Sequence, residues 1–175
     1  EKNKAKFKRY DNIEKNIKDI IDKNVIGFLN EQELIAKYAE YNNESIENGN
    51  RILDIEKLKN IVGYITKEMN QVKKVVLMKL LWYIDALSYK DRGYSITGLV
   101  YTHMPYGALP IGHKEIIELS SLKSNLFIND KEYEEYRIEF NEEYKLKKLE
   151  SKEKEIIDKV IDKFKGYSSH EISNY

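Results

Sequence analysis

The feature that most constrains the fold is the apolar run from Val75 to Leu87, VVLMKLLWYIDAL. Because nearly every position is apolar, a helix built from this run has almost no polar face and must be packed over most of its circumference. The run is too short to span a membrane, which takes about 20 apolar residues, and Lys79 and Asp85 interrupt it. Gly93 can take the left-handed conformation that closes a helix. We therefore predict a central helix over about residues 71–90.

The segment before this run predicts a second helix that packs against it. Asp54 has a side chain suited to an N-cap, and apolar residues then recur at helical spacing on one face. These residues are Leu58, Ile61, Val62 and Ile65. Asn70 is placed to cap the central helix. Because two helices joined by a few residues usually lie antiparallel, we expect this pair to be the nucleus of the fold.

The N-terminal part predicts two shorter helices. Isoleucines at helical spacing indicate the first, over about residues 12–24. Asn30 and Glu33 have the form of a capping box, which would open a second helix that ends near Tyr41. Its inward residues would be Leu34, Ile35 and Tyr38. Residues 42–50, NNESIENGN, are rich in turn formers and indicate a connection or boundary.

This boundary suggests an N-terminal helical segment over residues 1–50 and a main domain over residues 51–175. The first segment has two features that bear on DNA binding. Five basic residues lie within residues 2–9, a run that is typical of a solvated terminus and sometimes of a nucleic-acid arm. Residues 32–36 and 46–49 weakly resemble parts of a helix-turn-helix, although the segment between them is short for a turn and a recognition helix. The other interpretation is a helical prelude to the main domain.

After Gly93 the pattern becomes alternating, which predicts a strand over residues 94–101. Prolines and glycines over residues 105–112 then predict a tight, irregular loop. A short helix with Ile116, Ile117 and Leu119 should follow. Residues 126–128 and 136–140 alternate around a polar turn and suggest a small hairpin.

Two more helices are indicated near the end of the chain. Ser151 begins an amphipathic helix with Gly166 as its stop. Its inward residues are Ile156, Ile157, Val160, Ile161 and Phe164. Ser168 and Glu171 form a second capping box, with Ile172 and Tyr175 expected inward. We expect that further helix continues beyond Tyr175, so that the chain is a fragment of a longer protein.

Together these elements predict an α+β fold that is mainly α-helical, a helical bundle around the central helix with a small antiparallel β element. Thirty Lys and Arg residues balance thirty Asp and Glu residues in a chain of 175, so no overall field attracts nucleic acid. The absence of cysteine excludes disulfide and thiolate chemistry and fits the cytoplasm, where we expect the protein. We expect no membrane association.

Asp85 is the residue in the apolar run that most needs an explanation, because a buried carboxylate must be paired, hydrogen-bonded or protonated. One interpretation is structural: it accepts backbone hydrogen bonds from residues 95–107. The other is a general acid or base with a raised pKa, which would need a catalytic partner within reach. The sequence shows no nucleophile or base spaced to meet it, and we predict no catalytic residues and no enzymatic activity.

Metal and cofactor sites are not indicated either. The three histidines, His103, His113 and His170, have no metal-ligand spacing, and no cysteine could complete a zinc site. The glycines are too dispersed to form a phosphate-binding loop. We therefore predict no metal and no cofactor.

Three motifs resemble the Panacea domain, also described as the SocA-like or phage-associated antitoxin domain. They are Lys-Leu-Leu-x-Tyr-x-Asp, Ile-Thr-Gly-x-x-Tyr and Pro-Tyr-Gly-x-x-Pro. The matching residues are Lys79, Leu80, Leu81, Tyr83, Asp85, Ile96, Thr97, Gly98, Tyr101, Pro105, Tyr106, Gly107 and Pro110. The resemblance covers about residues 54–175. Ala108 departs from the family pattern, which commonly has proline there.

The resemblance implies the antitoxin of a bacterial or prophage toxin–antitoxin pair, which neutralises its cognate toxin by direct protein–protein binding. Domains of this family pair with many unrelated toxins, so the resemblance implies a class of partner. Aromatic and methionine side chains on a rigid rim suit such an interface. The candidate contact residues are Tyr101, His103, Met104 and Tyr106. The alternative is a prophage-associated transcription regulator that binds DNA through its N-terminal part.

Overall fold

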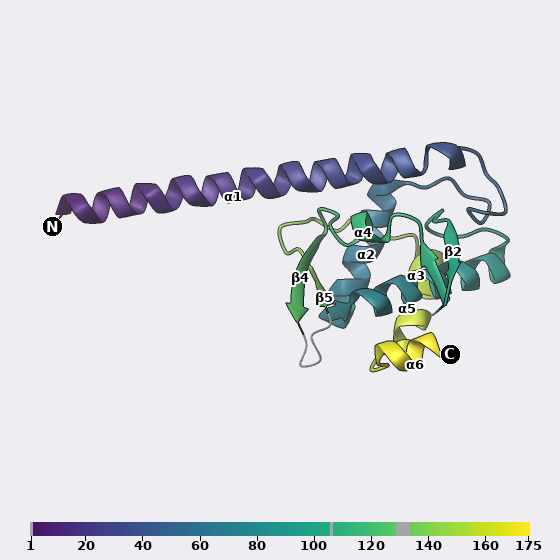
Figure 1. Cartoon of the computed structure of the whole chain (residues 1–175). Coiled ribbons are helices and arrows are strands. Elements are labelled where there is room, and N and C mark those ends of the chain that lie inside the picture. Colours follow the sequence, from purple (N-terminus) through teal and green to yellow (C-terminus); the bar gives the residue numbers. More distant parts are fainter. Residues whose placement is uncertain (1, 106, 129–133) are drawn as a thin grey trace.

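A computed structural model describes residues 2–105, 107–128 and 134–175, with side chains described from residue 17 onward except those of residues 20, 23 and 24. Figure 1 shows a long helix that leads into a body of helices and two small sheets. The fold is α+β and mainly helical, as the sequence predicts. The helices are α1 (Lys2–Lys37), α2 (Ile55–Met69), α3 (Lys74–Arg92), α4 (His113–Ile116), α5 (Ser151–Phe164) and α6 (Ser169–Ser173), with a 3₁₀ turn at Ala39–Tyr41.

The strands of the described residues form two antiparallel sheets. They are β1 (Gln71–Lys73), β2 (Tyr101–Met104), β3 (Gly107–Pro110), β4 (Leu122–Ile128) and β5 (Glu134–Phe140). One sheet has the order β1-β5-β4, and β2 pairs with β3 in the other. The β4–β5 hairpin confirms the one predicted from alternation, with Leu126 opposite Tyr136 and Leu122 opposite Phe140.

The central helix is α3, and its inner face is fully buried. Leu77, Leu80, Leu81 and Ile84 have no exposed surface. Gly93 closes the helix at φ +80°, as predicted. The expectation of nearly complete packing is wrong at one edge, where Val75, Trp82 and Tyr89 are more than a third exposed. Helix α3 packs along α5 and β3, and α6 lies against it.

The prediction that α2 and α3 form an antiparallel pair is wrong. Asp54 caps α2 by accepting a hydrogen bond from the Lys57 amide, and the Leu58 face is buried, as expected. Asn70, however, ends α2 with φ +67° instead of opening α3. Residues 71–73 then pair with β5, so the chain changes direction before α3 begins at Lys74. Figure 1 shows the two helices running in different directions, and α2 packs against β5.

The N-terminal prediction of two helices is also wrong, because α1 runs without a break from Lys2 to Lys37. The Asn30–Glu33 pair lies inside this helix. A capping box opens a new helix only where the backbone before it leaves helical geometry. Gly27 does not interrupt the helix either, because a single glycine costs only about 1 kcal/mol in a helix interior. Leu34 and Tyr38 are buried against the body, whereas Ile35 faces outward. No second helix follows within residues 42–54, so the weak resemblance to a helix-turn-helix has no structural counterpart there.

Residues 94–100 do not form the predicted strand, and regular pairing begins only at Tyr101. The predicted irregular loop at 105–112 contains a hairpin instead, in which Tyr101 faces Pro110 and Met104 faces Gly107. The apolar residues after Gly93 are buried, but no neighbouring strand pairs with them. Side chains supply the hydrogen bonds that a paired strand would otherwise supply.

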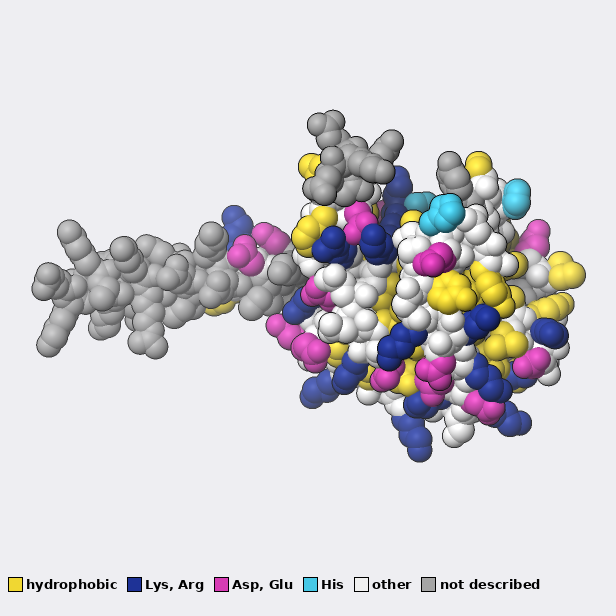
Figure 2. Space-filling model, turned by 90° about the horizontal axis from the view of Figure 1, so that it is seen from below, with side chains coloured by type: hydrophobic (Ala, Val, Ile, Leu, Met, Phe, Trp, Pro, Cys, Tyr) yellow, Lys and Arg dark blue, Asp and Glu magenta, His cyan; other side chains and the backbone are white. Residues whose placement is uncertain are grey.

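The last two helices agree with the sequence. The predicted inward residues of α5 are buried, and Ser168 and Glu171 form the capping box of α6. Tyr175 differs, because it is largely exposed and touches the rings of Phe164 and Tyr83 from outside. Helix α6 lies at the bottom of Figure 1, and Figure 2 shows hydrophobic side chains gathered on the face seen from that direction.

Candidate functional site

Asp85 organises the segment that follows α3. One oxygen of its carboxylate accepts hydrogen bonds from the amides of Ile96 (2.8 Å) and Thr97 (2.9 Å). The other accepts from the hydroxyls of Thr97 and Tyr101, the latter at 2.8 Å. We call these four residues the Asp85 cluster. The predicted hydrogen bonding of Asp85 is therefore confirmed.

The hydrogen bonding of the Asp85 cluster fits a structural role. Burial raises the pKa of the Asp85 carboxyl, while its hydrogen-bond donors act in the opposite direction. Burial, together with the neighbouring Asp85, also raises the pKa of Tyr101 well above its ordinary value. Both carboxylate oxygens are used in holding the chain. This arrangement favours the structural interpretation of Asp85 over the acid–base one.

The rest of residues 94–100 is held by other side chains. Ser95 donates its hydroxyl hydrogen to the Asn48 carbonyl and accepts a hydrogen bond from the Gly98 amide. Gly98 has φ +76°, and a Cβ there would lie 2.7 Å from the Leu53 amide nitrogen. Buried backbone groups need hydrogen-bond partners, and here side chains supply them. The segment is therefore fixed in position without belonging to a sheet.

Lys79 holds the next part of the chain, the β2–β3 hairpin. Its side chain is largely buried, and its Nζ donates to the Ala108 carbonyl at 3.5 Å. A Cβ at Gly107 would lie 2.3 Å from Nζ, so a larger residue would force the lysine end to shift, and the φ of +97° there also favours glycine. Burial lowers the pKa of Lys79. Helix α3 thus holds the irregular segment with Asp85 and the hairpin with Lys79.

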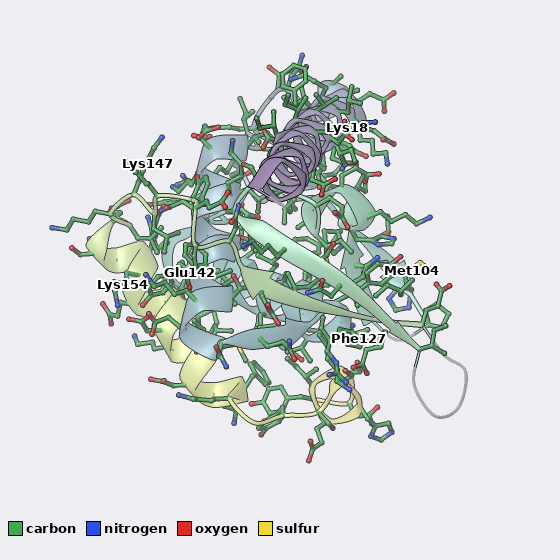
Figure 3. All side chains as sticks on the ribbon, turned by 90° about the vertical axis from the view of Figure 1, so that its left-hand side faces the viewer. Lys18, Met104, Phe127, Glu142, Lys147 and Lys154 are labelled. Atoms are coloured by element: carbon green, nitrogen blue, oxygen red, sulfur yellow. The ribbon has the colours of Figure 1, made fainter. Side chains whose placement is uncertain are left out.

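A groove opens between the first half of α3 and the β2–β3 hairpin. We call it the hairpin groove. Its lining residues are Lys74, Val75, Met78, Lys79, Met104, Pro105, Gly107, Ala108, Leu109 and His113. Its surface is almost wholly apolar, with a volume of about 440 Å³, and Val75 and Met104 are nearly half exposed. Met104 projects at the edge of the body in Figure 3.

Charged groups at the edge of the groove are basic. Among its described lining residues there is no carboxylate, whereas Lys74, Lys79 and His113 are all present. Burial and the proximity of Lys114 lower the pKa of Lys74. Burial and Lys74 lower the pKa of His113. These shifts favour loss of a proton, and a carboxylate docking at this edge would oppose them.

The predicted site residues fall into three groups. Leu80 and Leu81 are core residues, and Tyr83 stacks on Phe164 with ring centres 4.5 Å apart. Lys79, Asp85, Thr97, Gly98, Tyr101, Gly107 and Pro110 position the segment and the hairpin. His103 and Met104 are exposed on β2, and Pro105 is exposed beside them. Tyr106 lies outside the described residues.

Tyr101 differs from the other candidate contact residues. Its hydroxyl donates into the protein, to Asp85, and its ring packs edge-on against Trp82 with centres 5.0 Å apart. Sequence reasoning missed Val75, Met78, Leu109 and His113 as groove residues. Met78 itself is buried, and the exposure of the other three depends on how far the hairpin stands from α3, which no local pattern encodes.

The sequence model of a known family, described as Antitoxin SocA-like, Panacea domain, matches residues 77–175. The match spans more than half of the chain. The chain belongs to this family. Within the Panacea domain, the match includes Lys79, Asp85, the segment they hold and the β2–β3 hairpin. Searches among curated proteins and among solved structures found no match.

Two further findings describe the Panacea domain and its N-terminal extension. Within the described residues, no helix is both long and apolar enough to cross a lipid bilayer. Among the same residues, no three His, Asp or Glu side chains are grouped so that they could hold a metal ion.

Proposed function

We propose that this chain neutralises a cognate toxin protein of a bacterial or prophage toxin–antitoxin pair by binding it directly at the hairpin groove. Membership of an antitoxin family supports the class of function. The observation that carries the location is the groove itself, an exposed apolar surface held in place by two buried charged residues of α3, Lys79 and Asp85. Fixed apolar surfaces suit protein binding because little entropy is lost on docking.

The groove also suggests the chemistry of the toxin segment that enters it. Val75, Met104 and Leu109 offer apolar contacts, and methionine adapts to irregular shapes. Lys74 and His113 stand at its edge. We propose that the toxin inserts apolar side chains and places a carboxylate against the basic edge, because such a charge pattern favours association with the correct partner.

The structural role of Tyr101 changes the proposed contact surface. Its hydroxyl is bound to Asp85, so replacing Tyr101 would disturb the fold as well as the surface. We therefore base the contact on His103, Met104 and the groove, and keep Tyr106 as a sequence-based candidate. We also propose that the antitoxin domain begins near residue 51, because the Leu58 face of α2 belongs to the same core as α3.

The test is co-expression of the full chain with the product of the neighbouring open reading frame, if that product alone is toxic. Val75→Glu and Met104→Glu each place a carboxylate in the groove, next to apolar contacts. We expect each to weaken toxin binding at least about 10-fold, which is about 1.4 kcal/mol, and to reduce rescue of growth. Circular dichroism should show an unchanged fold, because both side chains are nearly half exposed.

Ile46→Glu is the matched control, because Ile46 is 80% exposed in the loop before α2 and outside the groove. It should bind and rescue like the wild type. His103→Ala tests the outer side of β2 separately. If both groove variants fold and rescue cells fully, the groove is not the binding surface. If the wild-type chain rescues no cells from the neighbouring product, the neutralising function with that partner is wrong.

A further inference from the structure

The second large apolar surface of the molecule lies on α1, away from the groove. At 100° per residue, six apolar side chains fall within about 120° of the helix circumference. They are Ile17, Ile21, Val25, Phe28, Leu29 and Ile35, and each is between 47 and 60% exposed. We call them the α1 stripe. The body contacts another side of the helix, where Leu34 and Tyr38 are buried.

Helix α1 extends well past the body in Figure 1. A helix of 36 residues is about 54 Å long. Helices in water owe most of their stability to packing of an apolar face, and single helices without such packing are marginal. The described residues of the body leave this stripe uncovered, so any cover for it must come from outside them.

We propose that a second copy of this chain covers the α1 stripe, with the two α1 helices antiparallel about a two-fold axis near residue 26. A two-fold interface must be complementary to itself, and the stripe meets this condition. Ile17 and Ile35 lie nine residues on either side of position 26, so each would meet the other in the partner copy. Val25 and Phe28 lie beside the axis.

One pair of charges beside the stripe is also complementary under this symmetry. Lys18 lies eight residues before position 26, and Glu33 lies seven residues after it. Lys18 of one copy would therefore approach Glu33 of the other. Glu33 also forms an ion pair with Lys37 within its own helix at 3.1 Å, and it remains exposed enough to make a second contact. Figure 3 shows Lys18 on α1, outside the body.

The chain contains no cysteine, so a single introduced cysteine reports only on its own position. In the full chain, Val25→Cys should form a disulfide-linked dimer on mild oxidation, because residue 25 lies beside the axis. Ile17→Cys alone should not, whereas a mixture of Ile17→Cys and Ile35→Cys chains should form the mixed dimer. Ile46→Cys, in an exposed loop, sets the background from random collisions.

Sedimentation of the full chain without oxidation gives an independent readout. We expect a concentration-dependent dimer, at least 10-fold weaker dimerisation for Phe28→Glu and Lys18→Glu, and recovery in the double variant Lys18→Glu/Glu33→Lys. The double variant separates charge pairing between copies from any loss of helix stability.

Three outcomes would overturn the proposal. A wild-type chain that stays monomeric, with Val25→Cys no more reactive than Ile46→Cys, excludes the dimer. Efficient cross-linking of Ile17→Cys with itself indicates parallel helices. A monomeric wild type that loses toxin binding on Phe28→Glu assigns the stripe to the toxin instead.

Discussion

At the scale of single residues, two buried charged side chains of α3 hold different parts of the chain. Lys79 supports the hairpin from below, and Asp85 replaces the strand neighbour that residues 94–100 lack. Each charge is expensive to bury and is retained beside groups that hydrogen-bond to it. Because the two residues are six positions apart on the helix, their side chains point to different segments. One helix therefore fixes two consecutive pieces of the chain.

Asp85→Ala should lower the free energy of unfolding by on the order of 2–6 kcal/mol, because at least two buried amides lose their acceptor at about 1–3 kcal/mol each. Asp85→Asn keeps one acceptor oxygen and should cost less. Urea denaturation measures both. Asp91→Ala, at an exposed position in the same helix, is the control. Equal stability of Asp85→Ala and wild type would contradict the structural role of the carboxylate.

His113 should make stability depend on pH. Its folded pKa lies below its ordinary value, and the groups near it are Lys74, Lys114, Lys37 and Glu115. The unfolded chain therefore takes up a proton more readily, so stability falls as the pH drops from about 6.5 through the lower folded pKa. Urea midpoints at several pH values should fall less for His113→Gln than for wild type. Identical pH profiles would show that His113 does not contribute.

At the scale of elements, the segment between α3 and β2 shows how an irregular stretch can be as fixed as a strand. Residues 95–100 are all buried, and their conformation depends on a glycine at one particular position. Gly98 passes so close to residues 51–53 that no side chain fits there. Gly93 has a similar positive φ but open space around its Cα.

This contrast gives a matched pair of variants. Gly93→Ala should cost only the left-handed backbone penalty of about 1–2 kcal/mol. Gly98→Ala should cost about 1–3 kcal/mol more, because its Cβ also meets backbone atoms of the preceding loop. Thermal melting of the two variants measures the difference. Equal losses would mean that the loop can move away from Gly98.

The elements that sequence reasoning found correctly are those with many apolar positions, nearly continuous in α3 and periodic in α5. It missed β1, because three residues carry no period and this strand exists only through pairing with β5, about 65 residues later. It read residues 94–101 as a strand because burial and alternation coincide there, while the hydrogen-bond partners are side chains. It divided α1 because Asn30 and Glu33 match a cap that the backbone does not use. The groove depends on the spacing of distant elements and was only partly anticipated, through Met104.

At the scale of the whole molecule, the groove and the α1 stripe are separate surfaces with different supports. The groove rests on α3, within the core. The stripe rests on a helix that, among the described side chains, contacts the body near its C-terminal end, where Lys37 pairs with Glu115 at 2.7 Å and Glu31 with Lys59 at 3.2 Å.

Hydrogen exchange should reflect this difference. In dilute solution, amides of residues 25–29 should exchange by local opening, far faster than those of residues 77–84, whose helix is buried and opens only with the whole fold. Mass spectrometry of peptic fragments measures both. Protection of residues 25–29 should rise with protein concentration if the stripe pairs. Equal protection of both segments at every concentration would show that α1 is held by the body along its length.

Tyr38 links the beginning of the chain to its middle. Its hydroxyl donates to the Ile111 carbonyl at 3.0 Å and accepts from the Val100 amide at 3.2 Å. Gly112, next in the chain, leaves the space that Leu34 fills. During translation, the end of α1 therefore has no docking site until residues 100–112 have left the ribosome. At about 5–20 residues per second, that delay lasts several seconds. Throughout this interval the apolar residues of α1 are open to chaperones and to neighbouring nascent chains.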